Sequence, residues 1–298
     1  MLSAKPWRSE AVVRLGIGLF TCIYAGALLL SAFHAAGTAK AGWGFYSLLV
    51  LSLGCLGTTL ALLHKPWGYE SVMRRLMILM TCFYAGLFLG ACVQKIAGPA
   101  AASAGQMVVG VLSFQGAALL LAGRFLQDHQ TTWREGFGLS NCRGHALLLG
   151  LILACLFLPV GYGLQWLSAE AMVHLPRLKL NPEDQQAVQT LAATTNWAQR
   201  WAFGLVTIFL VPPAEETLFR GILYPWIKQA GWPRVALWGT SLFFALVHFN
   251  LASFLPLTVF ALLLTALYER TDNLLAPVAA HAMFNALNFA RLCMLDKT

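Results

Sequence analysis

The chain has 298 residues, of which 58% are hydrophobic and only 11% are charged, and its mean hydropathy is +0.67. This composition excludes an ordinary soluble domain and indicates a membrane protein. The formal net charge of +8 is spread through short connections rather than gathered into one patch. We therefore expect a lipid bilayer around the chain and no nucleic-acid partner.

Apolar runs of about 20 residues, the length that crosses about 30 Å of hydrocarbon, predict five spans in the first part of the chain. They lie at about 11–33, 43–63, 73–96, 105–125 and 144–166. The remainder is more fragmented, and its apolar stretches lie near 197–212, 214–228, 234–250, 253–268 and 273–292. We expect an all-α polytopic membrane bundle of about eight or nine transmembrane helices, because helices satisfy their own backbone hydrogen bonds in lipid.

Basic residues alternate between the predicted connections, and the positive-inside rule assigns the richer connections to the cytoplasm. Lys5, Arg8 and Arg14 precede the first span. We therefore expect an integral membrane protein, in a bacterial inner membrane, with a cytoplasmic N-terminus. The connection at 167–196 belongs on the opposite side; residues 181–186 resemble the start of an interfacial helix, although a solvated loop is favoured there.

An internal repeat with an offset of 60 positions occupies the first part of the chain. Lys5-Pro6-Trp7 recurs as Lys65-Pro66-Trp67, and Thr21-Cys22 recurs as Thr81-Cys82. The repeat predicts a duplicated helical hairpin over 1–130, followed by a separate core over 144–298. Because the repeat holds no ionisable residue at mid-span, a packing module is favoured over a transport pathway.

The most unusual segment is Pro-Ala-Glu-Glu-Thr-Leu-Phe-Arg at 213–220, which puts charged residues into apolar sequence. Such groups are costly at membrane depth and usually mark a functional site. On a helix, Glu216 and Arg220 share a face and can form an ion pair, whereas Glu215 points about 100° away and can face a cavity. The preceding Pro-Pro pair predicts a helix break or start. The alternative is an interfacial cluster that ends a span.

Two further pairs follow at the same four-residue spacing, Phe244 with His248 and His281 with Asn285. Each pair is expected on one face of an apolar helix. A histidine and an amide can donate hydrogen bonds to one oxygen atom. Either pair alone could be an interhelical packing contact, but three helices that each contribute a polar pair predict a shared site.

The ordered motifs Glu-Glu-x-x-x-Arg, Phe-x-x-x-His and His-x-x-x-Asn resemble those of the CPBP family of intramembrane proteases, also called the CAAX protease and bacteriocin-processing or Abi family. All three motifs match over roughly residues 145–292. The resemblance implies an intramembrane endopeptidase. Its substrates would be membrane-associated peptides or proteins, with prenylated CAAX proteins and leader peptides among the possibilities.

The resemblance also implies the roles of the motif residues. The implied catalytic residues are Glu215, Glu216, His248, His281 and Asn285, and the implied supporting residues are Arg220 and Phe244. Glu215 and His248 would bind and deprotonate the attacking water, while the third motif would form an oxyanion hole. Glu216 would orient the site, and a direct role for it stays open.

Metal dependence and two other classes of function stay open at this point. A glutamate and two histidines could bind Zn²⁺ and acidify a bound water, but Asn285 suits an oxyanion better, so we favour a mechanism without a cofactor. A proton-coupled carrier would use Glu215 or Glu216 as its protonation site. A carrier also predicts broken helices in two matching halves, which the repeat does not supply. A non-catalytic scaffold predicts function that survives loss of Glu215.

Overall fold

A computed structural model describes residues 2–36, 110–174, 185–194 and 196–295, together with Pro182 and a few isolated positions between 46 and 57. Within these residues the chain forms helices and turns, without a strand. The predicted second repeat copy and the predicted spans at 43–63 and 73–96 lie almost entirely outside them. The chain divides into two compact units, Ser9–Phe125 and Met1–Arg8 with Leu126–Thr298.

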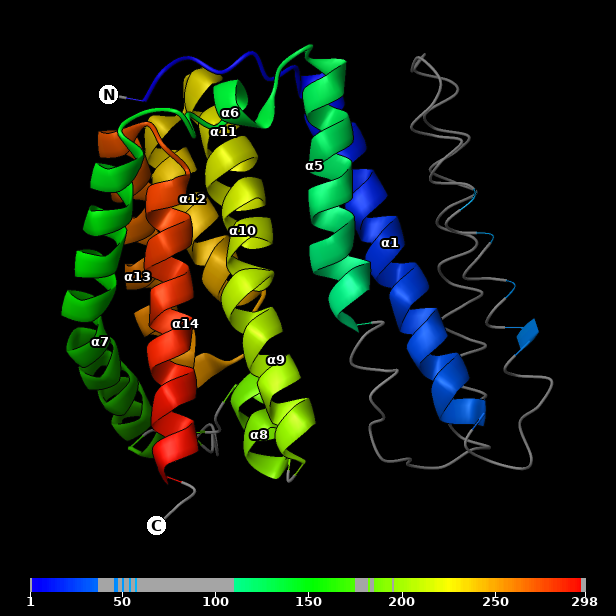
Figure 1. Ribbon diagram of the computed structural model, residues 1–298, viewed down its shortest axis with the longest axis vertical. Helices are drawn as coiled ribbons and strands as arrows, with labels where there is room; N and C mark the ends of the chain where they lie inside the picture. The colour runs from blue at the N-terminus through cyan, green and yellow to red at the C-terminus, as the bar shows by residue number, and fades with distance from the viewer. Residues whose placement is uncertain are drawn as a thin grey trace. The chain divides into compact units, whose positions relative to one another are not determined.

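The described part of the unit Ser9–Phe125 contains the first predicted span. Helix α1 (Ser9–Ala36) confirms that span, and it lies beside the π-helix η1 (Leu112–Gly116) and the start of α5 (Ala117–Asp128) (Figure 1). A Cβ atom at Gly26 would lie 2.2 Å from the Cβ of Ser113. A glycine is therefore needed where α1 approaches η1.

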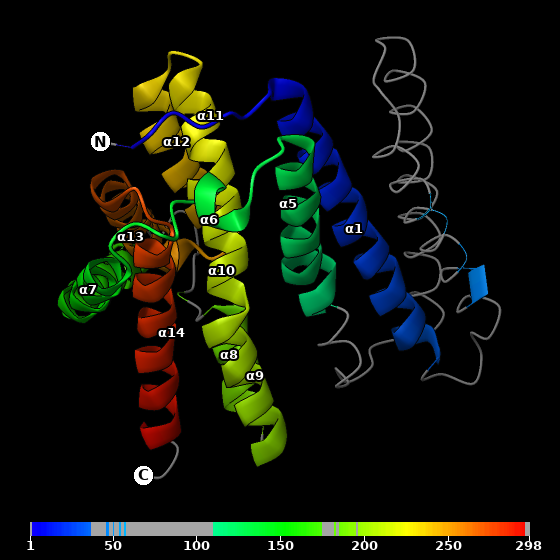
Figure 2. The ribbon, with the colours of Figure 1, turned by 45° about the horizontal axis from the view of Figure 1, so that its top comes forward.

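The other unit carries all three motifs, and its centre is formed by three long helices that pack against one another: α7, α13 and α14 (Figures 1 and 2). Its helices are α6 (Trp133–Gly136), α7 (Arg143–Val173), α8 (Gln186–Ala193), α9 (Trp197–Phe209), α10 (Val211–Glu216), η2 (Thr217–Leu223), α11 (Tyr224–Gln229), α12 (Pro233–Leu246), α13 (Leu251–Thr271) and α14 (Leu275–Leu295).

Small and aromatic residues explain how these three helices pack. A Cβ atom at Gly150 on α7 would lie 2.5 Å from the backbone oxygen of Ala276 on α14, so glycine allows a close approach of the two backbones. Phe260 on α13 stacks on Phe157 and packs at a tilt against Phe284, with ring centroids 4.8 and 4.7 Å away, and those two rings also contact each other at 5.8 Å. The resulting core holds one side of the motif-bearing helices in place.

The apolar stretches expected at 197–212 and 214–228 form one nearly continuous helical run, Trp197–Gln229, so that expectation is corrected. The Pro-Pro pair stands at the start of α10, as predicted, but only Leu210 separates α10 from α9. Proline is tolerated in the first turn of a helix, where its missing N–H is not needed. The prolines therefore begin a new helical segment without ending the run.

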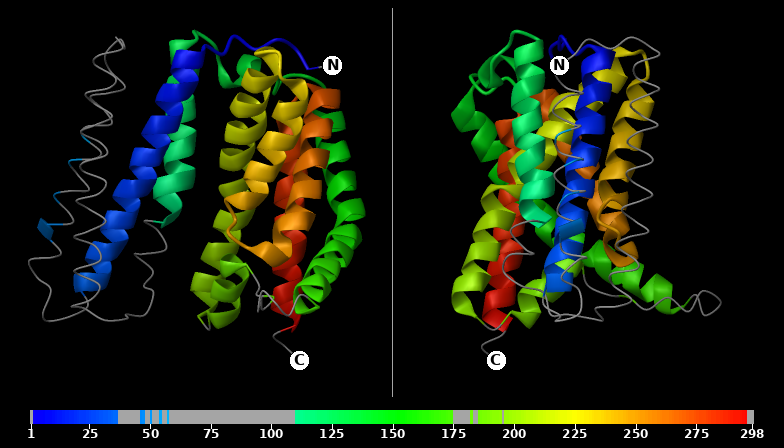
Figure 3. Two further views of the ribbon diagram at one scale, coloured as in Figure 1. Left: turned by 180° about the vertical axis from the view of Figure 1, so that it is seen from behind. Right: turned by 90° about the vertical axis from the view of Figure 1, so that its right-hand side faces the viewer.

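Four helices of the described chain are long and apolar enough to cross a membrane: Ser9–Leu30, Arg143–Val173, Trp197–Gln229 and Leu251–Thr271. The protein is thus an all-α integral membrane protein, although the expected total of eight or nine spans is not confirmed. The solvated loop favoured within 167–196 is wrong in part, because α7 continues to Val173 and α8 occupies Gln186–Ala193 (Figure 3).

The segment before α1 belongs to the motif-bearing unit and runs along one end of it, next to α11 (Figure 2). The buried indole of Trp7 donates a hydrogen bond to the carbonyl of Gly221 in η2, at 2.9 Å. The ammonium of Lys5, also buried, pairs with Asp272 at 3.1 Å. The N-terminal segment thus contacts η2 through Trp7 and the end of α13 through Lys5.

Candidate active site

A fully buried carboxylate, Glu216, is the centre of a charged cluster. Its Oε1 accepts hydrogen bonds from Nη1 of Arg220 and from Nδ1 of His281, each at 2.9 Å. Glu216 and Arg220 are 0% and 1% exposed. The ion pair predicted between Glu216 and Arg220 is therefore confirmed, and the histidine of the third motif joins it.

The local backbone around this cluster is unusual. Glu215 and Glu216 end α10, and the next seven residues, Thr217–Leu223, form the π-helix η2 that carries Arg220. Segments of π-helix are rare and are frequent at functional sites. A Cβ atom at Gly221 would lie 2.7 Å from the ring of Phe137, so this glycine lets η2 pack tightly against its neighbour.

Glu215 differs from Glu216 in its surroundings, as the helical positions predicted. It is 7% exposed, and among the described residues its Oε2 has no hydrogen-bond partner. A buried carboxylate oxygen without a donor is unfavourable unless water or a ligand satisfies it. Oε2 of Glu216 is likewise buried without a partner in the described chain, but Oε1 of Glu216 accepts two hydrogen bonds, whereas no hydrogen bond is made by Oε2 of Glu215. Glu215 is therefore the less constrained of the two carboxylates.

His248 lies just beyond α12 rather than on it, which corrects the expected helical position. Helix α12 ends at Leu246, and the left-handed φ of 49° at Phe249 turns the chain away. The Nδ1 of His248 lies 2.7 Å from the carbonyl oxygen of Phe244. Because a carbonyl only accepts, Nδ1 is the donor, and Nε2 of the neutral ring keeps a lone pair.

Phe244 connects the three motifs. It is fully buried, and its ring centroid lies 4.4 Å from the guanidinium carbon of Arg220. The same ring is 4.8 Å from the ring of His248 and 5.8 Å from that of His281. The three motifs thus converge on one aromatic side chain, and that convergence was expected from their shared spacing.

The two polar residues of the third motif have separate partners. His281 is bonded to Glu216, whereas Nδ2 of Asn285 donates to the backbone carbonyl of Thr207 in α9 at 2.9 Å. Sequence reasoning missed Thr207, because a backbone acceptor has no sequence signal. It also missed Phe260, whose ring lies perpendicular to that of His281 with the two centroids 5.9 Å apart, and whose sequence context is that of any core aromatic residue.

The bond to Glu216 determines which protons His281 can offer. A carboxylate oxygen accepts, so Nδ1 of His281 carries a hydrogen in this arrangement. In the neutral ring Nε2 then has no hydrogen, and only the imidazolium presents a second N–H donor. Any role of His281 as a donor to a substrate oxygen therefore requires the protonated ring.

A bound metal ion would need several ligands from the same residues. Among the described residues, no three His, Cys, Asp or Glu side chains lie close enough together to hold a metal ion. Catalytic zinc sites usually have three protein ligands. The arrangement of Glu215, His248 and His281 in this part of the chain does not supply such a set.

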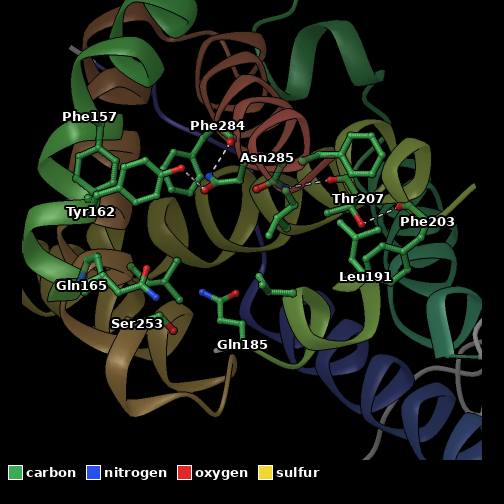
Figure 4. A pocket seen from close by; sticks show the side chains of 17 residues that line it. Phe157, Tyr162, Gln165, Gln185, Leu191, Phe203, Thr207, Ser253, Phe284 and Asn285 are labelled. Carbon is green, nitrogen blue, oxygen red and sulfur yellow. Dashed lines mark hydrogen bonds between the residues drawn. The ribbon is translucent and has the colours of Figure 1, made fainter. Parts of the chain in front are cut away.

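A pocket lies beside Asn285 and is lined from α7, α8, α9, α13 and α14, together with Gln185 immediately before α8 (Figure 4). Thr207 and Asn285, which are bonded to each other, are both part of its wall. Glu215 and His248 are not among its lining residues. The pocket therefore adjoins the third motif rather than the charged cluster.

These features define a polytopic helical membrane protein with a buried glutamate, arginine and histidine centre. Residues 196–287 match the family model described as type II CAAX prenyl endopeptidase Rce1-like. All residues of the three motifs lie inside the matched segment, so the resemblance drawn from the motifs is confirmed there.

One relative is the uncharacterized protein YpbD of Bacillus subtilis (strain 168), which is 38% identical over 82 residues. That match covers 26% of this chain and 39% of the relative, so less than half of the relative is represented. No solved structure matches the chain. The family likeness is thus a property of the C-terminal helices that carry the motifs.

Proposed function

We propose that the protein is an intramembrane endopeptidase that hydrolyses peptide bonds in membrane-associated peptides or proteins. The observation that carries this proposal is the convergence of the three motifs around Phe244, inside the segment that matches the endopeptidase family. The substrate would reach the site from a bacterial inner membrane, and the N-terminus would be cytoplasmic.

Glu215 is the proposed general base. Its unpartnered oxygen accepts a proton from water, and the water oxygen attacks the carbonyl carbon of the scissile bond. The carbonyl oxygen then becomes an oxyanion. When the tetrahedral intermediate collapses, the C–N bond breaks and Glu215 returns the proton to the leaving amine. The lone pair on Nε2 of His248 would orient the water by accepting its other hydrogen.

His281 and Asn285 are the proposed oxyanion donors. His281 would donate from Nε2 as an imidazolium, with Glu216 as its counter-ion. Nδ2 of Asn285 carries two hydrogens, of which one is bonded to the carbonyl of Thr207 and the other would donate to the oxyanion. A correctly placed donor of this kind contributes about 3 kcal/mol to transition-state stabilisation.

Charge balance supports this assignment. With both glutamates ionised and Arg220 charged, the cluster has a net charge of −1 when His281 is neutral and zero when it is protonated. A buried cluster is favoured when its charges cancel. The proposed imidazolium at His281 is the form that cancels the charge of the cluster, and it leaves Glu215 as the base.

The test is cleavage of a library of membrane-associated peptides by the purified protein in detergent. Glu215→Gln and His248→Ala are each expected to lower the rate at least about a hundredfold. The matched controls are Glu170→Gln and His174→Ala, which alter an exposed ion pair near the end of α7 and should leave the rate unchanged. Each protein is measured with and without a chelator.

Loss of cleavage in both site variants, with no effect of chelation, would support the glutamate mechanism. Inhibition by the chelator with recovery on added Zn²⁺ would instead make the enzyme metal-dependent. Identical product profiles for the wild type and both site variants would refute the protease proposal and leave a scaffold as the better explanation.

A further inference from the structure

We propose that the pocket beside Asn285, here called the amide pocket, binds an uncharged stretch of the substrate peptide through its backbone and excludes charged side chains. This inference rests on the proposed function, because the pocket borders a residue assigned to the oxyanion hole. It adds a substrate class that neither the family match nor the catalytic cluster specifies.

The first observation is that none of the 17 residues that line the pocket carries a charge (Figure 4). The polar ones have amide or hydroxyl groups, and the others are mainly aliphatic or aromatic. A charged side chain that entered would lose its water without gaining an ionic partner from the wall. The pocket therefore selects against Lys, Arg, Asp and Glu at the bound positions of a substrate.

The second observation is that several amides in the pocket are open to a ligand. Gln165 on α7 and Gln185 at the start of α8 point into it (Figure 4), and within the described chain their side chains have no hydrogen-bond partner. A side-chain amide offers both a donor and an acceptor, and a peptide unit needs the same two groups. Asn285, with its N–H on Thr207, keeps its oxygen as a third polar contact.

Other polar groups in the wall are already committed to protein partners. The hydroxyl of Tyr162 donates to Oδ1 of Asn288 at 2.9 Å, and Nδ2 of Asn288 donates to the carbonyl of Phe284 at 2.8 Å. These bonds fix one wall of the pocket, whereas the side-chain amides of Gln165 and Gln185 make no hydrogen bond within the described chain. The contrast indicates that the open amides serve a molecule that enters the pocket.

A peptide backbone fits this wall better than a lipid chain does. An acyl or prenyl chain would cover the aromatic side chains of the pocket but would bury the amides of Gln165 and Gln185 without partners. Burying an unbonded amide is unfavourable. A neutral peptide segment satisfies both kinds of surface, because its backbone bonds to the amides and its apolar side chains pack on the aromatic rings.

The test introduces a charge into the pocket. Gln165→Glu adds a carboxylate to the wall, and Gln199→Glu is the matched control, since Gln199 is exposed on α9 and does not line the pocket. The probes are a neutral peptide that the wild type cleaves and versions with single Lys, Asp or Gln replacements on either side of the scissile bond. A third variant, Gln165→Leu, removes the amide but adds no charge.

The wild type should cleave the neutral and Gln-containing peptides and discriminate by about tenfold or more against Lys and Asp at the positions that enter the pocket. Gln165→Glu should restore cleavage of the Lys peptide at one such position by about tenfold and weaken that of the Asp peptide further. Gln165→Leu should raise KM for the neutral peptide more than it lowers kcat. Unchanged profiles in correctly folded Gln165 variants, or equal cleavage of charged peptides by the wild type, would overturn the proposal.

A binding measurement separates this proposal from the proposed protease activity. If the wild type cleaves nothing, fluorescence anisotropy of a labelled neutral peptide still reports on the pocket. Weaker binding to both Gln165 variants, with normal binding to Gln199→Glu, would support the pocket without the protease. Equal binding to all variants would refute the pocket proposal. Displacement of the peptide by an isoprenoid alcohol that binds Gln165→Leu more tightly than the wild type would also refute it.

Discussion

Replacing Glu216 by Gln tests whether the charged cluster holds the site together. The substitution keeps the side-chain shape but leaves the guanidinium of Arg220, which is 1% exposed, without its carboxylate partner. The contacts that remain include the carbonyl of Ala261 at 3.3 Å, the rings of Phe244 and Phe219, and the charge of Glu215, which is not directly bonded to it. Removing one partner of a buried ion pair destabilises a protein by about 3–5 kcal/mol.

Glu215→Gln is the matched control for this prediction, because the two glutamates are adjacent and equally conservative to replace. Glu215 interacts with the charge of Arg220 but does not bond to it directly as Glu216 does, and one of its oxygens is unbonded among the described residues. We therefore expect Glu215→Gln to abolish activity with a stability change of less than about 1 kcal/mol. Glu216→Gln should reduce both stability and activity.

The assay is thermal unfolding in detergent, followed by tryptophan fluorescence. For the helical unit that carries the motifs, the expected loss at Glu216 corresponds to a fall in Tm on the order of 10 °C. The double variant Glu216→Gln/Arg220→Met removes both charges and should recover a large part of that loss. If the double variant were as unstable as the single one, or if Glu215→Gln fell equally far, the ion-pair argument would be refuted.

Two further predictions concern packing, and each has its own control. Gly150→Ala should destabilise the protein by about 1–3 kcal/mol, because the added Cβ would meet a backbone oxygen of α14 at 2.5 Å. Gly163→Ala on the same helix meets nothing within 4 Å and should be neutral or stabilising by about 0.5–1 kcal/mol. Trp7→Phe removes the indole donor to η2 and should cost about 1–3 kcal/mol, whereas Trp133→Phe, at a partly exposed indole, should cost less. Thermal unfolding measures all four changes, and equal shifts within a pair would contradict the stated cause.

The parts of the site that sequence could predict are those set by local spacing. The contact between Glu216 and Arg220 follows from their separation by four positions, which places both on one face of a helix. It forms even though the backbone between them is a π-helix. The neighbouring Glu215 is turned away from that pair for the same reason. Such relations within one helix depend on periodicity alone, so they were visible before the structure.

The parts that sequence could not predict depend on contacts between distant segments. The bond from His281 to Glu216 joins residues 65 positions apart, and the position of Trp7 against Gly221 spans 214 positions. The widening of the helix in η2 and the end of α12 before His248 are backbone effects that side-chain pattern does not reveal. The nearly continuous run Trp197–Gln229 was hidden because two prolines usually indicate a break.

On the proposed function, the chemistry of the site and its substrate preference have one physical cause. The bilayer surroundings penalise any charge without a partner, so Glu216 is held between Arg220 and His281, and Glu215 is the carboxylate that we assign as the base. None of the residues that line the amide pocket is charged, although Arg291 contacts the ring of Tyr162 and Arg200 contacts the carbonyl of Leu191, and a neutral peptide therefore enters it at a small desolvation cost. A charged substrate residue would lose its hydration on entering the pocket, so neutrality of the substrate at the positions that enter the pocket is expected to control binding.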